Sequence, residues 1–378
     1  MLLRNRLKRD RVNLLKLKNK KLIETFIVLV FIGMLGVAIT EDNNKLEEPK
    51  GSSGNSVYNE NLAESSDNKI DNYANVINYE YTTKISTKSK QKIVHLKDLD
   101  YTFCEYIDIP GMPDTKEDDF LNRYIFSTAQ CPQGICFTED FVLLTSYSDE
   151  KDCLGAVMVF DITTGDYLIT LGMDEDSHLG GIAYDGENIW VCNSKSRSVE
   201  RISYDFIQLM ATQNKGEVID ATNLVDVYKI KNTPSCIAYY NGRLWVGTHN
   251  KWMNSHMVAY YYDKNEDCLK NLSTYNIPSQ VQGIVFGEQG EVYLSISYGR
   301  QMSSYIKKYE SVFSMTEKVD EPSLTIEMPP GAEEIDISDE YLYVLFESAG
   351  ETYYEGTDGN GRSLSPLDKL LMIPIYKE

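Results

Sequence analysis

Several motifs that would commit this chain to a known chemistry are missing. The sequence contains no zinc-ligand spacing, no glycine-rich phosphate loop, no nucleophile elbow and no dinucleotide-binding fingerprint. No metal and no cofactor is therefore predicted. Catalysis by residues outside such motifs stays open, because enzymes and pure binding proteins occur on the same folds.

Positive charge is scarce in most of the chain. Residues 1–40 carry nine basic and two acidic side chains, a net charge of +7, within a chain whose total charge is −20. The remaining residues therefore carry a net charge of −27. Because a body this acidic repels phosphate backbones, nucleic acid is not expected as a partner.

Long apolar runs are absent except for one near the start of the chain. Phe26–Ile39 holds 14 uncharged residues, and the run reaches 18 residues when 22–25 are included. The shorter length suits the core of a signal peptide, and the longer one just spans a bilayer. The basic residues before it place the N-terminal side in the cytoplasm, so the rest of the chain is expected outside the cell. We expect an uncleaved, single-pass membrane anchor, with secretion after signal cleavage as the alternative.

The sequence divides into four segments. Residues 1–21 are a basic cytoplasmic segment, and residues 22–40 are the anchor or signal peptide. Residues 41–97 are rich in Asn, Lys, Glu and Ser and have no sustained apolar period, so we interpret them as a disordered linker. Residues 98–378 are the folded domain. The abundance of tyrosine, 27 residues in the chain, favours strands there.

Five internal repeats indicate the architecture of the folded domain. Each repeat has a short strand motif centred on an isoleucine and a second strand motif 7 or 8 residues later. Successive isoleucines are 47, 55, 47 and 51 residues apart. Four antiparallel strands at such a period are typical of β-propeller blades. The five central residues are Ile135, Ile182, Ile237, Ile284 and Ile335.

The fifth repeat ends before its outer strand, whereas Tyr101–Ile109, upstream of the first repeat, has the composition of a strand. We therefore predict that Tyr101–Ile109 pairs with Asp368–Tyr376 and closes an all-β, five-bladed β-propeller. A pair of β-sandwiches would not explain the even period, and an open array of repeats would leave Tyr101–Ile109 unpaired. A six-bladed ring is the remaining alternative.

The repeats resemble exported bacterial β-propellers of the lactonase-like and quinoprotein amine dehydrogenase-like class. The resemblance covers Tyr101 to the C-terminus and lies in Gly-Ile or Gly-Val inner strands and Leu-Trp-Val or Tyr-Val second strands. The segments Ser177–Gly186, Ser295–Arg300 and Val344–Ala349 look like parts of secreted propellers with no assigned activity. The resemblance implies a fold and a compartment outside the cytoplasm, and it implies no catalytic residue.

In a propeller, the loops that enter the inner strands and those that leave the second strands meet on one face, around the central channel. Binding residues are therefore expected on that face. The ligand-binding candidates in these loops are Gln133, His178, His249, Gln282, Tyr298, Arg300, Glu334 and Glu347.

Some of these candidates have a structural alternative. His178 lies beside two glycines, where it can ligate a metal or move protons, or simply cap a loop. Glu333 and Glu334 alternate in direction along a strand, so only one of them can face the channel. If Glu334 does, it can pair with Arg300 or Glu347. Two carboxyl groups about 5 or 9 Å apart would suit glycoside hydrolysis.

The favoured function is a binding module that takes a carbohydrate, a peptide or a small carboxylate at the channel mouth. Arg300 can fork two hydrogen bonds to such a carboxylate or to an internal acid. Trp252, in a loop, either stacks on a sugar or peptide or packs against the domain. The alternative is a sugar- or lactone-directed hydrolase or lyase that uses His178, Glu334 or Glu347. A structural scaffold for an envelope complex is the third hypothesis.

The seven cysteines leave one thiol unpaired if the others form disulfides. Cys136 and Cys192 are expected to be small core residues within strands. Cys131 and Cys153 are expected in loops, where they can form a disulfide.

Overall fold

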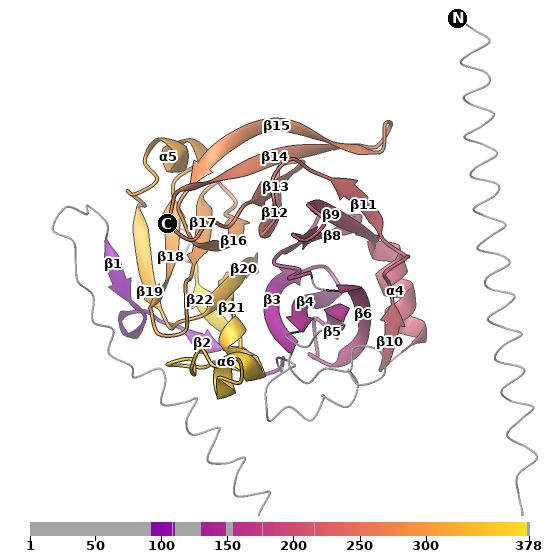
Figure 1. Cartoon of the computed structure of the whole chain (residues 1–378), viewed down its shortest axis with the longest axis horizontal. Helices are drawn as coiled ribbons and strands as arrows, with labels where there is room; N and C mark the ends of the chain where they lie inside the picture. Colours follow the sequence, from indigo (N-terminus) through magenta and orange to yellow (C-terminus); the bar gives the residue numbers. More distant parts are fainter. Residues whose placement is uncertain are drawn as a thin grey trace, which may run out of the picture. The chain divides into compact units, whose positions relative to one another are not determined.

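The computed structural model describes residues 92–107, 109, 130–148, 154–175, 177–214 and 216–375. All of them belong to one of the two units into which the chain divides, Glu60–Glu378. Their strands form five sheets arranged around a common centre (Figure 1). The described part of the chain is therefore an all-β, five-bladed propeller, which confirms the fold predicted from the repeats.

Three blades contain four strands each, which are named in the order in which they lie in the sheet. The blades are β7 (Ile182–Tyr184), β8 (Asn188–Asn193), β9 (Ser198–Ser203) and β11 (Asp226–Lys229); β12 (Cys236–Tyr240), β13 (Arg243–Gly247), β14 (Ser255–Asp263) and β15 (Cys268–Ile277); and β20 (Ala332–Ser338), β21 (Tyr341–Phe346), β22 (Leu371–Pro374) and β2 (Thr102–Phe103).

The other two blades contain five strands each. They are β3 (Gln130–Phe137), β4 (Phe141–Ser148), β5 (Leu154–Asp161), β6 (Tyr167–Glu175) and β10 (Glu217–Asp220); and β16 (Val281–Phe286), β17 (Val292–Ile296), β18 (Ser304–Tyr309), β19 (Leu324–Met328) and β1 (Ile93–His95).

The prediction of four antiparallel strands per blade is wrong for these two blades. The fifth strands pair in parallel, β10 with β6 and β1 with β19. Each adds to the outer edge of a sheet, where unpaired backbone groups accept another strand. Strand β1 also lies inside the range 41–97 that the sequence assigned to the linker, so pairing begins before residue 98.

The ring closes where the two ends of the domain meet. Strand β2 pairs antiparallel with β22, with Thr102 opposite Met372 and Phe103 opposite Leu371. The predicted pairing of the first and last segments is confirmed for these residues. The inner strands contact one another in the cyclic order β3, β7, β12, β16, β20 and β3 again. Five blades therefore complete the ring.

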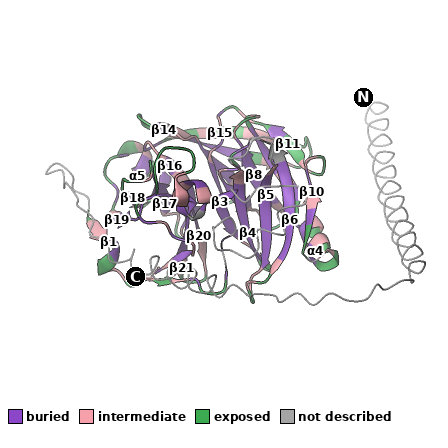
Figure 2. Ribbon diagram, turned by 60° about the horizontal axis from the view of Figure 1, so that its bottom comes forward, coloured by how far each residue is buried: buried purple, intermediate pink, exposed green. Residues whose placement is uncertain are grey.

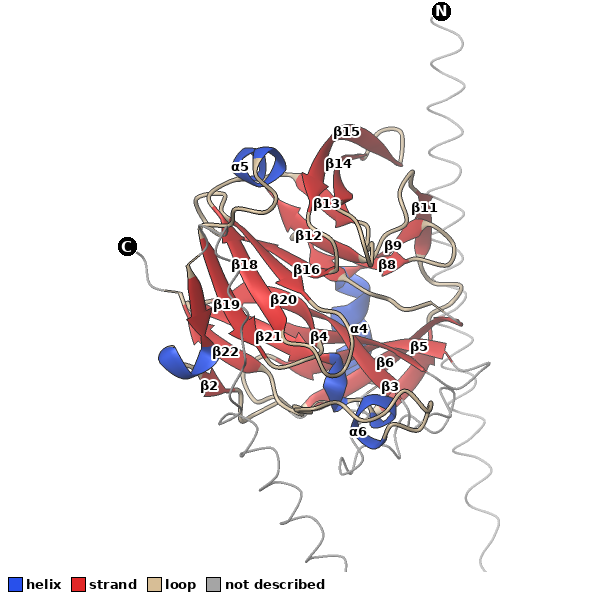
Figure 3. Cartoon of the chain, turned by 60° about the vertical axis from the view of Figure 1, so that its left-hand side comes forward, coloured by secondary structure: helices blue, strands red, loops and turns tan. Residues whose placement is uncertain are grey.

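In the part of the chain that the structure describes, helices are few and short (Figure 3). They are the α-helices α4 (Tyr204–Gln213), α5 (Val312–Glu317) and α6 (Glu351–Glu355) and the 3-10 helices η2 (Leu96–Asp98) and η3 (Glu347–Ala349). Helix α5 begins at a capping box in which Ser311 and Ser314 each bond the backbone amide of the other. Helices η3 and α6 lie between strands β21 and β22 in the chain. This insertion supplies some of the residues of the candidate site described below.

The core lies between the blades. The five repeat isoleucines occupy the inner strands, and none is more than 3% exposed. Buried strands continue from the centre into the blades, as the purple strands of Figure 2 show. Trp190 and Trp245 are buried at matching positions of the second strands. Because each blade packs apolar side chains against its neighbours, the ring is one continuous scaffold.

Several predictions concern residues that the structure does not describe. The basic segment 1–21, the membrane segment 22–40 and Cys153 lie outside the described residues. Among the described residues, no helix has the length and apolar character needed to cross a bilayer.

No disulfide joins any two of the cysteines that the structure describes. Cys136 and Cys192 are buried in strands, as predicted. Cys131 is also buried in a strand, so its prediction as a loop residue was wrong. The reason is that β3 begins at Gln130, earlier than the repeat pattern indicates.

Candidate functional site

A cavity of about 810 Å³ opens at one mouth of the ring, and all five blades line it. The predicted loops line it together with the ends of the inner strands. Gln133 and Gln282, which were expected in loops, lie in β3 and β16 because these strands begin earlier than the repeat pattern indicates. Seven of the eight candidates line this cavity: Gln133, His178, His249, Gln282, Tyr298, Arg300 and Glu347.

One repeated position supplies a ring of residues that line the cavity. In every blade, the residue two positions before the repeat isoleucine lines the cavity: Gln133, Gly180, Ser235, Gln282 and Glu333. In three of the inner strands the register shifts at this position, at Gln133, Gln282 and Glu333. Because such a bulge redirects a side chain, the position is set by its spacing from the isoleucine and not by simple strand alternation.

Glu334 belongs to the next layer and does not line the cavity. Its carboxyl group lies among inner strands, so that a Cβ atom added at Gly181 would come within 2.9 Å of Oε2 and one at Gly283 within 2.8 Å of Oε1. The Ile284 amide donates to Oε1 at 3.0 Å. Burial raises the pKa of Glu334 well above its ordinary value. Glu334 is therefore an internal residue that fills the channel, and the site role predicted for it is not supported by its position.

Glu333 and Glu347 form a hydrogen-bonded carboxyl pair at the floor of the cavity. They are 2% and 8% exposed, and their side chains bond to one another. Burial, followed by the neighbouring Glu347 charge, raises the pKa of Glu333 well above its ordinary value. Burial raises the pKa of Glu347 to about 7. Because two buried carboxylates in contact cannot both ionise readily, the pair shares a proton near neutral pH.

Neighbouring side chains hold this pair in place. Gln282 Nε2 donates to Glu333 Oε1 at 3.0 Å. Tyr353, on α6, and Gln133 both hydrogen bond to the Glu347 side chain. The hydroxyl groups of Tyr353 and Tyr147 are 3.3 Å apart. The sequence does not predict Tyr353 as a site residue, because it lies in the insertion between β21 and β22, outside the repeated strand motifs.

The Arg300 guanidinium bonds to an internal acid, which is one of the two kinds of partner that the sequence allowed. Its two terminal nitrogens each donate to one carboxylate oxygen of Asp358 at 2.7 Å, and Nη1 also donates to the Gly361 carbonyl at 2.7 Å. The guanidinium carbon lies 4.3 Å from the centroid of the Tyr353 ring. The Arg300 guanidinium holds the pKa of Asp358 well below its usual range. Arg300 thus ties the insertion to the cavity wall.

The two histidines of the cavity differ in their surroundings. His249 Nδ1 lies 3.3 Å from the Val281 carbonyl oxygen, so in a hydrogen bond between them Nδ1 is the donor. The exposed His178 ring packs edge-on against Tyr147, with centroids 4.4 Å apart. Among the described residues, no group of three or more His, Cys, Asp and Glu side chains is arranged to hold a metal ion.

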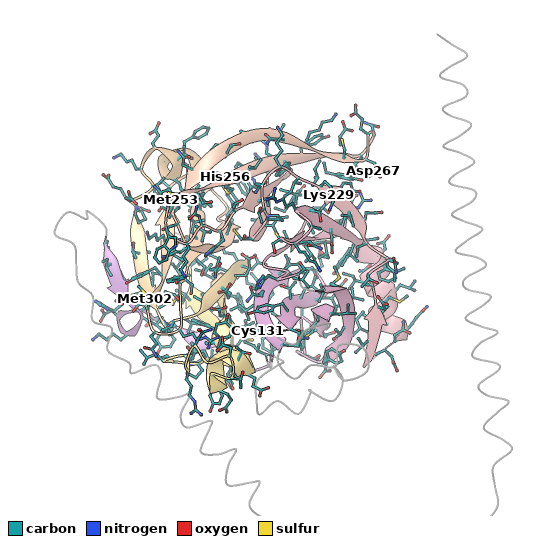
Figure 4. All side chains as sticks on the ribbon, viewed as in Figure 1. Cys131, Lys229, Met253, His256, Asp267 and Met302 are labelled. Carbon is teal, nitrogen blue, oxygen red and sulfur yellow. The ribbon has the colours of Figure 1, made fainter. Side chains whose placement is uncertain are left out.

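The rim of the cavity carries an aromatic pair that already holds a cation. Lys251 Nζ lies 4.9 Å from the Trp252 ring centroid and 4.4 Å from that of Tyr298. Trp252 is 76% exposed, as expected for a loop residue. Exposed Met253 and Met302, labelled in Figure 4, lie in the same two loops. The rim is therefore apolar and aromatic, whereas the floor is polar.

Neither a protein-family model nor a curated protein matches the sequence. Among solved structures, the chain is similar to the glutaminyl cyclase of Myxococcus xanthus, with 10% identity, a TM-score of 0.41 and coverage of 66% of this chain and 94% of that one. It is also similar to the hydrazine synthase of Kuenenia stuttgartiensis, with 12% identity, a TM-score of 0.35 and coverage of 56% and 55%. A third similar structure comes from a nidogen/laminin complex, with 13% identity, a TM-score of 0.36 and coverage of 65% and 84%. Similarity at this level assigns no activity to this chain.

Proposed function

We propose that this protein is a membrane-tethered propeller, displayed outside the cytoplasm, that binds a small polar ligand in the channel-mouth cavity. The observation that carries the proposal is the cavity itself, to which every blade contributes a residue two positions before its repeat isoleucine. Its volume of about 810 Å³ lies within the range of roughly 300–1,000 Å³ that is usual for small-molecule sites.

The contacts narrow the class of ligand. Of the three classes that the sequence suggests, a small carboxylate fits least well, because Arg300 is already bonded to Asp358 and the Glu333–Glu347 pair would repel it. Carbohydrates and peptides remain as ligand classes. Both present hydrogen-bonding groups to a polar floor and apolar surface to an aromatic rim.

The tether and the compartment rest on the sequence. The apolar run Phe26–Ile39 follows nine basic residues, which favours a single membrane crossing with the propeller outside. The resemblance of the repeats to exported bacterial propellers supports the same placement. Secretion after cleavage within residues 22–40 is the alternative.

Capture of small molecules tests the binding function. Full-length protein is incubated with the small-molecule fraction of a cell-envelope extract, washed and denatured, and the released compounds are identified by mass spectrometry. We expect a compound retained by the wild type and lost in a protein carrying both His249→Ala and Gln282→Ala. The matched control is His256→Ala, because His256 lies on β14 and does not line the cavity (Figure 4). Equal retention by the double variant and the control would contradict the proposal.

An acid–base enzyme is a second candidate, favoured by the shared proton of Glu333 and Glu347. A protonated carboxyl beside a carboxylate can both donate and accept a proton near neutral pH. The pair is too close for glycoside hydrolysis, which places its carboxyl groups roughly 5–5.5 Å or 6.5–9.5 Å apart. Hydrolysis of a lactone is the form of the hydrolase hypothesis that the geometry allows. Turnover of a panel of lactones that falls about 100-fold or more in Glu347→Gln would support it, and an absence of turnover in the wild type would exclude it.

A further inference from the structure

We propose that the ligand of the channel-mouth cavity carries a primary ammonium group, which binds at the cavity floor between Glu333 and Glu347. The inference rests on the proposed binding function and names the chemistry of its ligand. The floor consists of Gln133, Gln282, Glu333, Glu347 and Tyr353. Most hydrogen-bond donors of the floor already have partners within the protein, whereas some of its acceptors do not. A ligand that donates hydrogen bonds therefore fits this floor best.

The donors of the floor are used within the protein. The Gln282 amide nitrogen donates to Glu333 at 3.0 Å, and the Gln133 amide nitrogen donates to the Pro132 carbonyl at 3.0 Å and bonds Glu347. Tyr353 bonds Glu347. Since all of these partners are oxygen acceptors, they fix which end of each amide is the nitrogen. The floor therefore offers a ligand few donors.

The acceptors of the floor are not all used. Among the described residues, none donates a hydrogen bond to the side-chain oxygen of Gln133 or of Gln282. Gln133 and Gln282 line the cavity, and neither side-chain oxygen is one of the fully buried polar atoms that lack a partner, so both are accessible from the ligand space. A ligand that donates hydrogen bonds can therefore bond to them.

An ammonium group is the complement of such a floor. It brings three donors, no acceptor and one positive charge. The charge takes the place of the proton that Glu333 and Glu347 share, so that both carboxyl groups become carboxylates and one proton leaves on binding. A hydroxyl group brings one donor and no charge, and a quaternary ammonium brings charge and no donor.

Calorimetric titration with n-butylammonium tests the proposal on the full-length protein. Titrations in two buffers of different ionisation enthalpy give the number of protons released. We expect binding with release of up to one proton, and an affinity that rises with pH up to about tenfold per pH unit below the pKa of the pair. The matched probes are n-butanol, which keeps the alkyl chain without the charge, and tetramethylammonium, which keeps the charge without N–H donors.

Two variants locate the site. Glu347→Gln should weaken n-butylammonium binding at least about tenfold, because one of the two carboxylates is lost. Gln282→Leu keeps both carboxyl groups and removes one acceptor, so it should weaken binding less and retain proton release. His256→Ala should bind as the wild type does.

Three results would overturn the assignment: no binding of n-butylammonium, binding without proton release, or equal binding of n-butanol or tetramethylammonium. These results are distinguishable from failure of the proposed function. A neutral compound captured from the extract by the wild type and lost in the His249→Ala, Gln282→Ala protein would overturn the ammonium assignment and leave the binding function intact.

Discussion

Glu333 and Glu334 are neighbours in the chain with opposite surroundings. Glu333 faces the cavity and shares a proton with Glu347, whereas Glu334 lies in the layer below, where three other blades have Gly134, Gly181 and Gly283. The absence of side chains at those glycines leaves the space that the Glu334 carboxyl group occupies. A single strand thus supplies one acid to the site and another to the interior.

The proton shared by Glu333 and Glu347 makes stability depend on pH. Both pKa values are raised in the folded state, that of Glu347 to about 7, so the folded protein binds protons that the unfolded chain releases. This contribution is complete below the ordinary carboxyl pKa and is lost as the pH rises through the raised values. We expect Glu347→Gln to lose less stability than the wild type between about pH 5 and about pH 8, by roughly 1–3 kcal/mol.

Urea unfolding at both pH values measures this difference. The other buried carboxyl groups, Glu200, Glu327 and Glu334, and the partly buried Asp336 are present in both proteins, so their contributions cancel in the comparison. Parallel pH dependences of the wild type and Glu347→Gln would show that the pair shares no proton.

The close packing of the channel gives a second prediction for a single residue. A Cβ atom at Gly181 would lie 2.7 Å from the Ile237 amide nitrogen and 2.8 Å from Cys236 Cα, both backbone atoms that cannot move aside. We expect Gly181→Ala to lower the free energy of unfolding by about 1–3 kcal/mol. Thermal and urea unfolding measure the change, and a loss below about 0.5 kcal/mol would mean that the inner strands are free to separate.

At the scale of residues, the sequence predicts the residues that the repeats contribute to the site better than those of the insertion. Gln133 and Gln282 lie at the mouth because each has the same spacing from a repeat isoleucine. Tyr353 and Asp358 were not predicted, because they lie in an insertion that interrupts the repeat. Alternation along the strand does not predict which of Glu333 and Glu334 faces the cavity, because the register of β20 shifts between Ala332 and Ile335.

At the scale of elements, the inner and second strands are predictable because a constant spacing of 7 or 8 residues links them. The parallel strands β1 and β10 are not, since they contain three and four residues and their position is set by the free edge of another blade. Ring closure was predicted because the last repeat lacks an outer strand, and only β2 was available to supply it.

Strand β1 places His95 against the buried carboxyl group of Glu327. His95 Nδ1 lies 3.2 Å from Glu327 Oε2, and the Glu327 side chain is 1% exposed. We expect His95→Ala to destabilise the protein by about 1–3 kcal/mol, because the buried carboxyl group loses the ion pair that it forms when the imidazole is protonated. Lys97→Ala, at an exposed position nearby, is the control and should change stability by less than about 0.5 kcal/mol. Equal unfolding midpoints in urea for the two variants would contradict this role for β1.

Ring closure can be tested by shortening the chain from its N-terminal side. A protein beginning at Lys92 keeps β1 and β2, whereas one beginning at Glu105 loses both, together with buried Leu96 and Cys104. Each buried apolar side chain contributes about 1.5–3 kcal/mol, so we expect the shorter protein to be less stable by more than about 3 kcal/mol. Unfolding midpoints in guanidinium measure the difference. Equal midpoints would show that β22 does not need a partner.

At the scale of the whole molecule, the site is assembled from segments that are far apart in the chain, since all five blades contribute to one cavity. Its location therefore follows from the topology, whereas its ligand follows from local contacts that the repeats do not encode. The acidic body, with a net charge of −27 beyond residue 40, would attract a cationic ligand at long range.

The orientation across the membrane is the prediction that belongs to this scale. Alkaline phosphatase joined after Glu378 should be active, because this enzyme folds only outside the cytoplasm, and a fluorescent protein that matures only in the cytoplasm should stay dark at the same position. Replacing four of the nine basic residues before Leu22 with acidic ones should reduce the phosphatase signal. A dark phosphatase fusion and a bright fluorescent one would reverse the orientation.

The parallel pairing of β1 with β19 has a mechanical consequence for a tethered protein. Tension from an anchor in residues 22–40 would enter the propeller at Lys92 and reach β1 before β2. A pull along β1 shears its hydrogen bonds to β19 together, so they resist as a group and then fail as a group. Strand β1 would then detach first and lengthen the tether, while β2 still holds the ring shut.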